Sequence, residues 1–103
     1  MANRVIVITG ANGGLGRALA QMFDSDGEHV VLLGRTLSKV AEVAAELSDR
    51  AMAAECDVTS PESVRAAFAA IATRHPKIDV LINNAAIFEP FLIEEASDDQ
   101  LMR

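Results

Sequence analysis

The sequence predicts an α/β fold, a doubly wound parallel sheet with the element order β-α-β-α-β-α-β, in a single domain of 103 residues. Short apolar runs rich in β-branched residues at 5–8, 30–33 and 80–82 are typical of strands covered on both faces. The segments between them carry apolar residues at helical spacing. Strands that alternate with helices in this way favour a parallel sheet.

Three segments show the helical spacing, with apolar residues three or four positions apart. Each segment can therefore present one apolar stripe to the sheet. The stripes consist of Leu15, Leu19, Met22 and Phe23, of Val40, Val43, Ala44 and Leu47, and of Val64, Phe68, Ile71 and Ala72.

Local signals mark the ends of these helices. Gly27 follows the first stripe, and Thr36 or Ser38 can cap the second helix. Ser60-Pro61 combines an N-cap residue with a proline at the first helical position. Residues 51–56 are a weaker strand candidate, which we accept because the order helix, strand, helix requires a strand there.

The amino-acid composition limits the classes of molecule that the protein is expected to bind. Half of the residues are hydrophobic and the net charge is −6, which indicates an acidic globular domain. Nucleic acid and anionic membranes are therefore not expected as partners. The sequence shows neither a secretory signal nor a long apolar run, so we predict a cytoplasmic location.

Cysteine and histidine suggest no further chemistry. Cys56 is the only cysteine, and we expect a small buried apolar residue because no histidine near it in sequence could activate it. His29 and His75 lie far apart along the chain, and His75-Pro76 is typical of a helix end. We therefore predict no metal site.

The glycine-rich stretch T-G-A-N-G-G-L-G, from Thr9 to Gly16, joins the first strand to the first helix. Free backbone N–H groups and the positive end of the helix dipole would meet there, at the carboxyl edge of the sheet, where phosphates bind. Glycine would allow a tight turn and a close approach of a diphosphate to the backbone. The alternative is a glycine-rich turn that binds nothing.

The spacing of the glycines excludes two common motifs. The dinucleotide fingerprint G-x-G-x-x-G fails, because Leu19 stands where its last glycine would be. No lysine follows the glycines, which excludes a nucleoside-triphosphate P-loop.

The stretch does fit T-G-x-x-x-G-x-G, and with it the chain resembles the short-chain dehydrogenases/reductases that are built as one Rossmann-like domain. It also fits G-x-x-G-x-x-G, the spacing of the sugar-nucleotide epimerase branch, so the glycines alone leave both open. Asp57-Val58 and Asn83-Asn84-Ala85 resemble the D-V and N-N-A-G signatures of the single-domain branch and favour it. Ala86 departs from the final glycine of that signature.

The resemblance implies a set of cofactor-binding residues. Asp57 would accept a hydrogen bond from the adenine amino group, and Val58 would supply a backbone contact. Asn84 and Ala85 would line the ribose next to the nicotinamide, while Asn83 would tie strands together. The adenosine ribose and the diphosphate would be surrounded by Gly10, Asn12, Gly13, Gly14, Leu15 and Gly16.

The end of the second strand bears on the choice of cofactor. NAD needs a carboxylate there to hold the ribose hydroxyls, whereas NADP needs positive charge. The chain has Gly34-Arg35-Thr36 at this place, and Arg35 can form a fork of hydrogen bonds to a phosphate. We therefore expect NADP(H) to be favoured over NAD(H), the alternative being a merely exposed arginine.

The family's catalytic residues have no counterpart in this sequence. The resemblance implies a serine and a Tyr-x-x-x-Lys pair acting on a carbonyl or alcohol substrate, but the chain contains no tyrosine. Ser97 and Gln100 instead form a capping box that predicts the start of a fourth long helix, which Arg103 cuts short.

We therefore expect these residues to be the N-terminal, cofactor-binding half of a longer enzyme that forms homo-oligomers, and to be inactive alone. The alternatives are a cofactor-binding sensor or scaffold without catalysis, and a truncated product without a stable fold.

Overall fold

The computed structural model describes residues 4–83 of the chain. The four strands and three helices follow the predicted order, and the weak third strand is confirmed. The capping box at Ser97 and Gln100 lies outside the described residues. The elements are β1 (Val5–Thr9), α1 (Gly14–Ser25), β2 (His29–Gly34), α2 (Leu37–Ala45), β3 (Ala51–Glu55), α3 (Pro61–Ala72) and β4 (Val80–Ile82).

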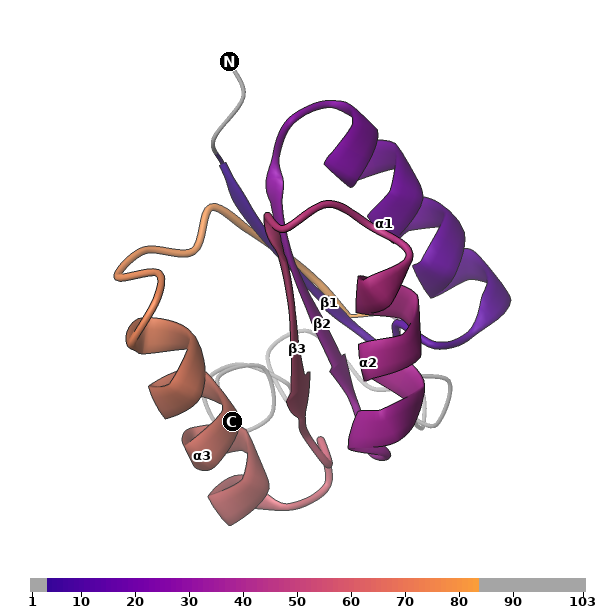
Figure 1. The fold of residues 1–103 in the computed structure, drawn as a ribbon. Coiled ribbons are helices and arrows are strands. Elements are labelled where there is room, and N and C mark those ends of the chain that lie inside the picture. The colour runs from indigo at the N-terminus through magenta and orange to yellow at the C-terminus, as the bar shows by residue number, and fades with distance from the viewer. Residues whose placement is uncertain (1–3, 84–103) are drawn as a thin grey trace, which may run out of the picture.

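The strands form one parallel sheet in the order β3-β2-β1-β4. In register, Val7 of β1 lies beside Val31 of β2 and Leu81 of β4. Helices α1 and α2 cover one face of the sheet and α3 covers the other (Figure 1). This is the arrangement that right-handed crossovers give when the chain winds outward from β1 in both directions.

Alternate residues of the central strands point to opposite faces and fill two apolar layers. Val5 and Val7 of β1 lie on the α3 side, whereas Ile6 and Ile8 lie under α1 and α2. All five residues of β1 are buried, as the continuous apolar run predicts. Leu81 of β4 is 44% exposed, so β4 is covered less well than β1.

The helix ends match the sequence signals in part. Ser60 caps α3 by accepting a hydrogen bond from the Ser63 N–H at 3.2 Å, and Pro61 occupies the first helical position. Thr36 is the N-cap residue of α2, but its side chain makes no capping hydrogen bond. Within residues 4–83, no helix has the length and apolar character needed to cross a bilayer.

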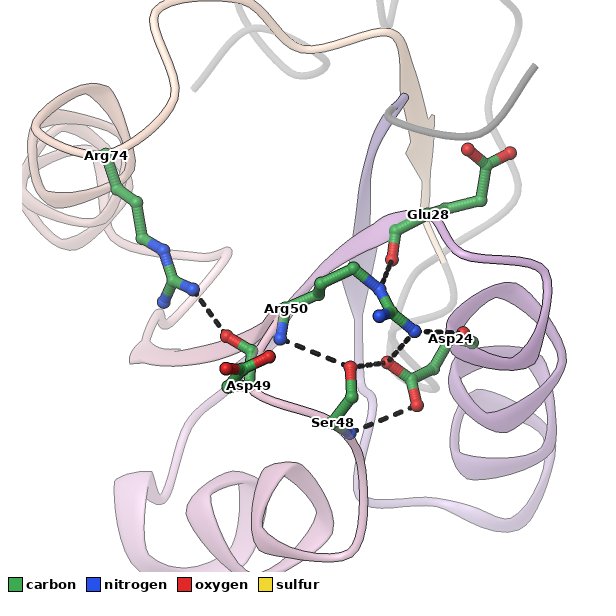
Figure 2. A network of polar contacts seen from close by, with 6 residues as sticks. All are labelled: Asp24, Glu28, Ser48, Asp49, Arg50 and Arg74. Carbon is green, nitrogen blue, oxygen red and sulfur yellow. Dashed lines mark hydrogen bonds and ion pairs between the residues drawn. The ribbon is translucent and has the colours of Figure 1, made fainter.

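A polar network joins α1 to the loop before β3 at the amino-terminal edge of the sheet (Figure 2). Ser48 donates its hydroxyl to Asp24 Oδ1 at 2.6 Å and its N–H to Oδ2 at 3.1 Å. Arg50 donates to the carbonyl oxygens of Asp24 at 2.7 Å and Glu28 at 3.4 Å. The Asp24 carbonyl oxygen also accepts from the Gly27 N–H at 3.0 Å, so Arg50 adds a second donor to it and ties the end of α1 to the loop before β3.

Two further arginines, Arg4 and Arg74, form polar contacts at the amino-terminal edge of the sheet. Arg4 forms an ion pair with the buried Glu28, with 2.6 Å between Nη2 and Oε2. The hydrogen bond from Arg4 lowers the pKa of the Glu28 carboxyl. Arg74 donates to the Asp49 carbonyl oxygen at 2.7 Å (Figure 2). At the amino-terminal edge, Arg4 is thus paired with a carboxylate and Arg74 with a backbone carbonyl oxygen.

The fold brings His29 and His75 together, although they lie far apart along the chain. The start of β2 and the end of α3 bring their ring centroids to 5.1 Å, with 57° between the planes. His29 Nδ1 and His75 Nε2 are buried and have no hydrogen-bond partner in the described part of the chain. No group of three or more residues among 4–83 has the side chains to hold a metal ion.

The histidine pair predicts a loss of stability in mild acid. Burial lowers the pKa of His75, and the charges of His29 and Arg74 lower it further. The unfolded chain therefore binds more protons than the folded one, so the unfolding free energy falls as the pH drops through about 6.5. Urea denaturation at a series of pH values measures this slope, which His75→Phe is expected to reduce. An equal slope in the variant would contradict the assignment.

Candidate functional site

The chain turns sharply where β1 ends at the carboxyl edge of the sheet. Gly10 has φ of 62°, a left-handed conformation that only glycine adopts without strain. The Gly13 N–H donates to the Gly10 carbonyl oxygen at 3.2 Å and closes the turn. The N–H of the fully buried Ala11 donates to the Leu33 carbonyl oxygen at 3.3 Å. These bonds fix the turn against β2.

The start of α1 leaves its backbone donors uncompensated. The N-cap residue Gly13 has no side chain to cap the helix, and no acidic residue stands in the first turn. The first intrahelical bond of this turn runs from the Arg17 N–H to the Gly13 carbonyl oxygen at 2.8 Å. The N–H groups of Gly14, Leu15 and Gly16 therefore lack an intrahelical acceptor, at the positive end of the helix dipole.

The packing of the chain itself does not require glycine at 13 or 14. Among residues 4–83, a Cβ atom built on Gly14 would meet nothing within 4 Å, and one on Gly13 would lie 3.6 Å from the Gly10 carbonyl oxygen, an ordinary contact. Leu15 is 64% exposed beside this open space, whereas Gly16 is buried against the sheet. The turn therefore presents bare backbone to its surroundings, a cradle that side chains would fill.

The ends of β2 and β3 bring two opposite charges to the same edge. Arg35 follows Gly34 and is exposed, and its positive charge contributes to a lowered pKa of Asp57. The larger cause is Thr59, which donates its hydroxyl at 2.7 Å and its N–H at 3.0 Å to Asp57 Oδ1. Asp57 Oδ2 has no hydrogen-bond partner within residues 4–83, so it is available as an acceptor.

The loop after β3 is held in place by contacts with α3 and with the apolar layer beneath it. The Asp57 N–H donates to Ser63 Oγ at 2.8 Å, and Val58 packs against the apolar layer under α3. Cys56 is 3% exposed, and burial raises the pKa of its thiol. The predicted role of Cys56 as a buried apolar residue is confirmed.

The hydrogen bonds from Thr59 to Asp57 were not predicted from the sequence, although Asp-x-Thr is a spacing at which an aspartate accepts hydrogen bonds from the residue two positions on.

Polar side chains join β1 to the end of β4. Thr9 Oγ1 lies 3.0 Å from Asn83 Oδ1 and 3.4 Å from the Ile82 carbonyl oxygen. This contact agrees with the expectation that Asn83 ties strands together. Asn84 and Ala85, the other candidates on this segment, lie outside the described residues.

The strand ends thus bring the described candidates to one edge, with the glycine turn after β1 and Arg35 and Asp57 after the next two strands. A family model described as short chain dehydrogenase matches residues 4–103. The chain belongs to the short-chain dehydrogenase family. The glycine-rich stretch that carries the resemblance forms the turn between β1 and α1.

Dehydrogenases from bacteria resemble the chain along nearly its whole length. An NAD-dependent glycerol dehydrogenase of Listeria innocua is 37% identical over 99 residues, which cover 95% of this chain and 37% of that protein. A meso-2,3-butanediol dehydrogenase of Serratia marcescens is 39% identical over 102 residues, which cover 98% and 41%.

Solved structures agree with the fold. A 3-ketoacyl-(acyl-carrier-protein) reductase from Brucella melitensis, complexed with NADH, superposes with a TM-score of 0.80 at 33% identity and covers 96% of this chain and 41% of that one. The chain therefore spans about two fifths of the length of these relatives.

The geometry of the turn predicts that substitution destabilises the protein at Gly10 but not at Gly14. Gly10→Ala is expected to lower the unfolding free energy by about 1–2 kcal/mol, because alanine is strained at positive φ. Gly14→Leu is expected to change it by less than about 0.5 kcal/mol, because the added side chain meets open space on a helix. Urea denaturation of both variants measures the difference. A Gly14→Leu variant as unstable as Gly10→Ala would contradict the geometry of the turn.

Proposed function

We propose that this chain is the nucleotide-binding part of an NADP(H)-dependent oxidoreductase. When bound, the cofactor would supply or accept the hydride exchanged with the carbonyl or alcohol carbon of a small-molecule substrate. The observation that carries the proposal is the open space over Gly14, beside the uncompensated N–H groups that begin α1. Family membership supports the same reading of this turn.

The chemistry of the turn fits a diphosphate. The N–H groups of Gly14, Leu15 and Gly16 can donate to phosphate oxygens, and the helix dipole favours negative charge there. Gly10 gives the turn its shape, and Gly13 keeps a side chain away from the ligand. Asn12 is exposed next to this turn and can reach a ribose or phosphate oxygen. Each of these groups binds the cofactor without taking part in the chemistry.

The other predicted site residues would bind the adenosine and nicotinamide ends of the cofactor. Asp57 Oδ2, which has no partner within residues 4–83, can accept from the adenine amino group, while Thr59 holds the carboxylate in place. Val58, anchored in the apolar layer, would present its backbone to the adenine. The assignment of Asn84 and Ala85 to the ribose next to the nicotinamide rests on the resemblance of their motif alone.

The preference for NADP(H) rests on the residues that end β2. Gly34 offers no carboxylate for the hydroxyls of an unphosphorylated ribose, and the exposed Arg35 can pair with a 2′-phosphate. A relative described as NAD-dependent and a structure that holds NADH show that related proteins use the unphosphorylated cofactor. The preference is therefore a property proposed for this chain's own Gly34-Arg35 pair.

Carbonyl reduction needs a proton as well as a hydride. The tyrosine and lysine pair that the family resemblance implies has no counterpart in these 103 residues, which contain no tyrosine. We therefore propose that these residues bind the cofactor and do not turn over substrate by themselves. A cofactor-binding sensor or scaffold is the alternative, and substrate-dependent oxidation of NADPH by the full-length protein separates the two.

Gly14→Leu tests the diphosphate site directly. The side chain would occupy the space over the turn, so the Kd for NADPH is expected to rise at least about tenfold. Fluorescence titration with NADPH measures the change, with the unfolding midpoint recorded on the same sample. Gln21→Leu, which adds leucine to an exposed position two turns further along α1, is the matched control. Unchanged affinity in Gly14→Leu would refute the proposed site.

Arg35→Ala tests the cofactor preference. A hydrogen-bonded charge pair is worth about 1.5–3 kcal/mol, so the Kd for NADPH is expected to rise about 10- to 100-fold. The Kd for NADH, which lacks the phosphate, is expected to change by less than about threefold. Arg65→Ala, at an exposed arginine of α3, controls for net charge. Equal losses for both cofactors, or a wild-type protein that prefers NADH, would count against NADP(H).

A further inference from the structure

We propose that Val40 is a specificity-determining residue that acts through Gly34. Its side chain fills the space where any β-carbon at position 34 would lie, and it thereby excludes the carboxylate that NAD binding needs at the end of β2. The inference deepens the proposed function and rests on it. It assigns the preference to packing inside the domain as well as to the charge of Arg35.

The geometry at Gly34 leaves no room for a side chain. A Cβ atom built there would lie 2.6 Å from Val40 Cγ1, well inside the separation of about 3.5–4.0 Å at which carbon atoms pack. It would also lie 3.4 Å from Asn12 Oδ1. Positive φ occurs at Gly10 and Gly27 and not at Gly34, so the backbone conformation would accept an ordinary residue. The obstacle is therefore steric and comes chiefly from one methyl group.

Val40 cannot easily move aside. It is fully buried in the layer between the sheet and α2, together with Ile8, Leu32 and Val43. A β-branched side chain in a helix is restricted to essentially one χ1 rotamer. The Val40 N–H donates to the Thr36 carbonyl oxygen at 3.4 Å, which holds this turn of α2 beside the end of β2. Relief of the clash would require a shift of the helix, and forced overpacking destabilises a core.

The contact between Val40 Cγ1 and the built Cβ also shows which substitution would make room for a side chain at position 34. Val40→Ala removes Cγ1 and leaves Val40 Cβ at 3.9 Å from the built atom, an ordinary contact. Gly34→Asp alone should therefore strain the domain without creating a usable ribose site. Gly34→Asp combined with Val40→Ala should accommodate the carboxylate. Val43→Ala makes the same deletion one turn further along α2, in the same apolar layer, and is the matched control.

The test measures unfolding midpoints and the Kd values of NADPH and NADH for the wild-type protein and for three variants. The variants are Gly34→Asp, Gly34→Asp with Val40→Ala, and Gly34→Asp with Val43→Ala. We expect Gly34→Asp to melt below the wild type and to bind both cofactors weakly. In the double variant with Val40→Ala, the unfolding midpoint should rise again, and the ratio of the Kd for NADPH to the Kd for NADH should increase at least about tenfold. The double variant with Val43→Ala should show neither change.

Two results would overturn the inference. One is a Gly34→Asp protein that melts like the wild type and already prefers NADH. The other is a Val40→Ala double variant that binds NADH no better than the Val43→Ala double variant. If Gly34→Asp does not fold, Gly34→Ala introduces the same Cβ atom, and additive midpoint changes of Gly34→Ala and Val40→Ala would equally refute the contact.

The wild-type titration keeps the two proposals distinguishable. A wild-type protein that binds NADH as tightly as NADPH refutes the cofactor preference, whatever the variants do. Non-additive midpoints at positions 34 and 40 would then still report the steric contact, now without a consequence for the cofactor. A wild-type preference for NADPH with additive midpoints refutes the inference and leaves the proposed function standing.

Discussion

The parallel pairing of β1 with both β2 and β4 is the constraint on which the rest of the structure depends. Since β1 lies between two strands that run in its own direction, the turns that follow all three strands emerge at one edge. The crossovers through α1 and α2 lead from β1 to β2 and β3 on one side, and the crossover through α3 returns from β3 to β4 on the other side of β1, which places α1 and α3 on opposite faces (Figure 1). The residues of the site come together because of this register, although they are far apart along the chain.

Polar groups at the amino-terminal edge of the sheet are hydrogen-bonded to one another, whereas backbone donors at the carboxyl edge are left without intrahelical acceptors. At the amino-terminal edge, Asp24, Ser48 and Arg50 satisfy one another and the nearby backbone carbonyl groups (Figure 2). At the carboxyl edge, α1 begins at Gly14, its N-cap residue Gly13 has no capping side chain, and no acid stands in its first turn. Helix α2 also lacks a capping hydrogen bond from its N-cap residue Thr36, so what distinguishes the start of α1 is the open space over Gly14 within residues 4–83. Paired groups stabilise the fold, and unpaired donors remain available to a ligand.

Sequence patterns predicted the features that depend on local periodicity and missed those that depend on three-dimensional packing. The buried run of β1 and the cap at Ser60 are local, and both are confirmed. The approach of His29 to His75 depends on where α3 ends above the sheet, which no local pattern encodes. In the same way, spacing placed Val40 on an apolar stripe without indicating that it packs over Gly34. Periodicity identifies the buried face of a helix but not the neighbour that each side chain meets.

The glycines of this chain are required for different physical reasons, and the difference separates fold from function. Gly10 is needed for its positive φ, and Gly34 for the space that Val40 occupies. Either substitution would disturb the protein whether or not it binds anything. Gly14 has an ordinary conformation on a helix and open space around it, so neither backbone strain nor packing accounts for it. The proposed diphosphate, which would approach the backbone at this position, gives a reason for glycine that the described residues alone do not.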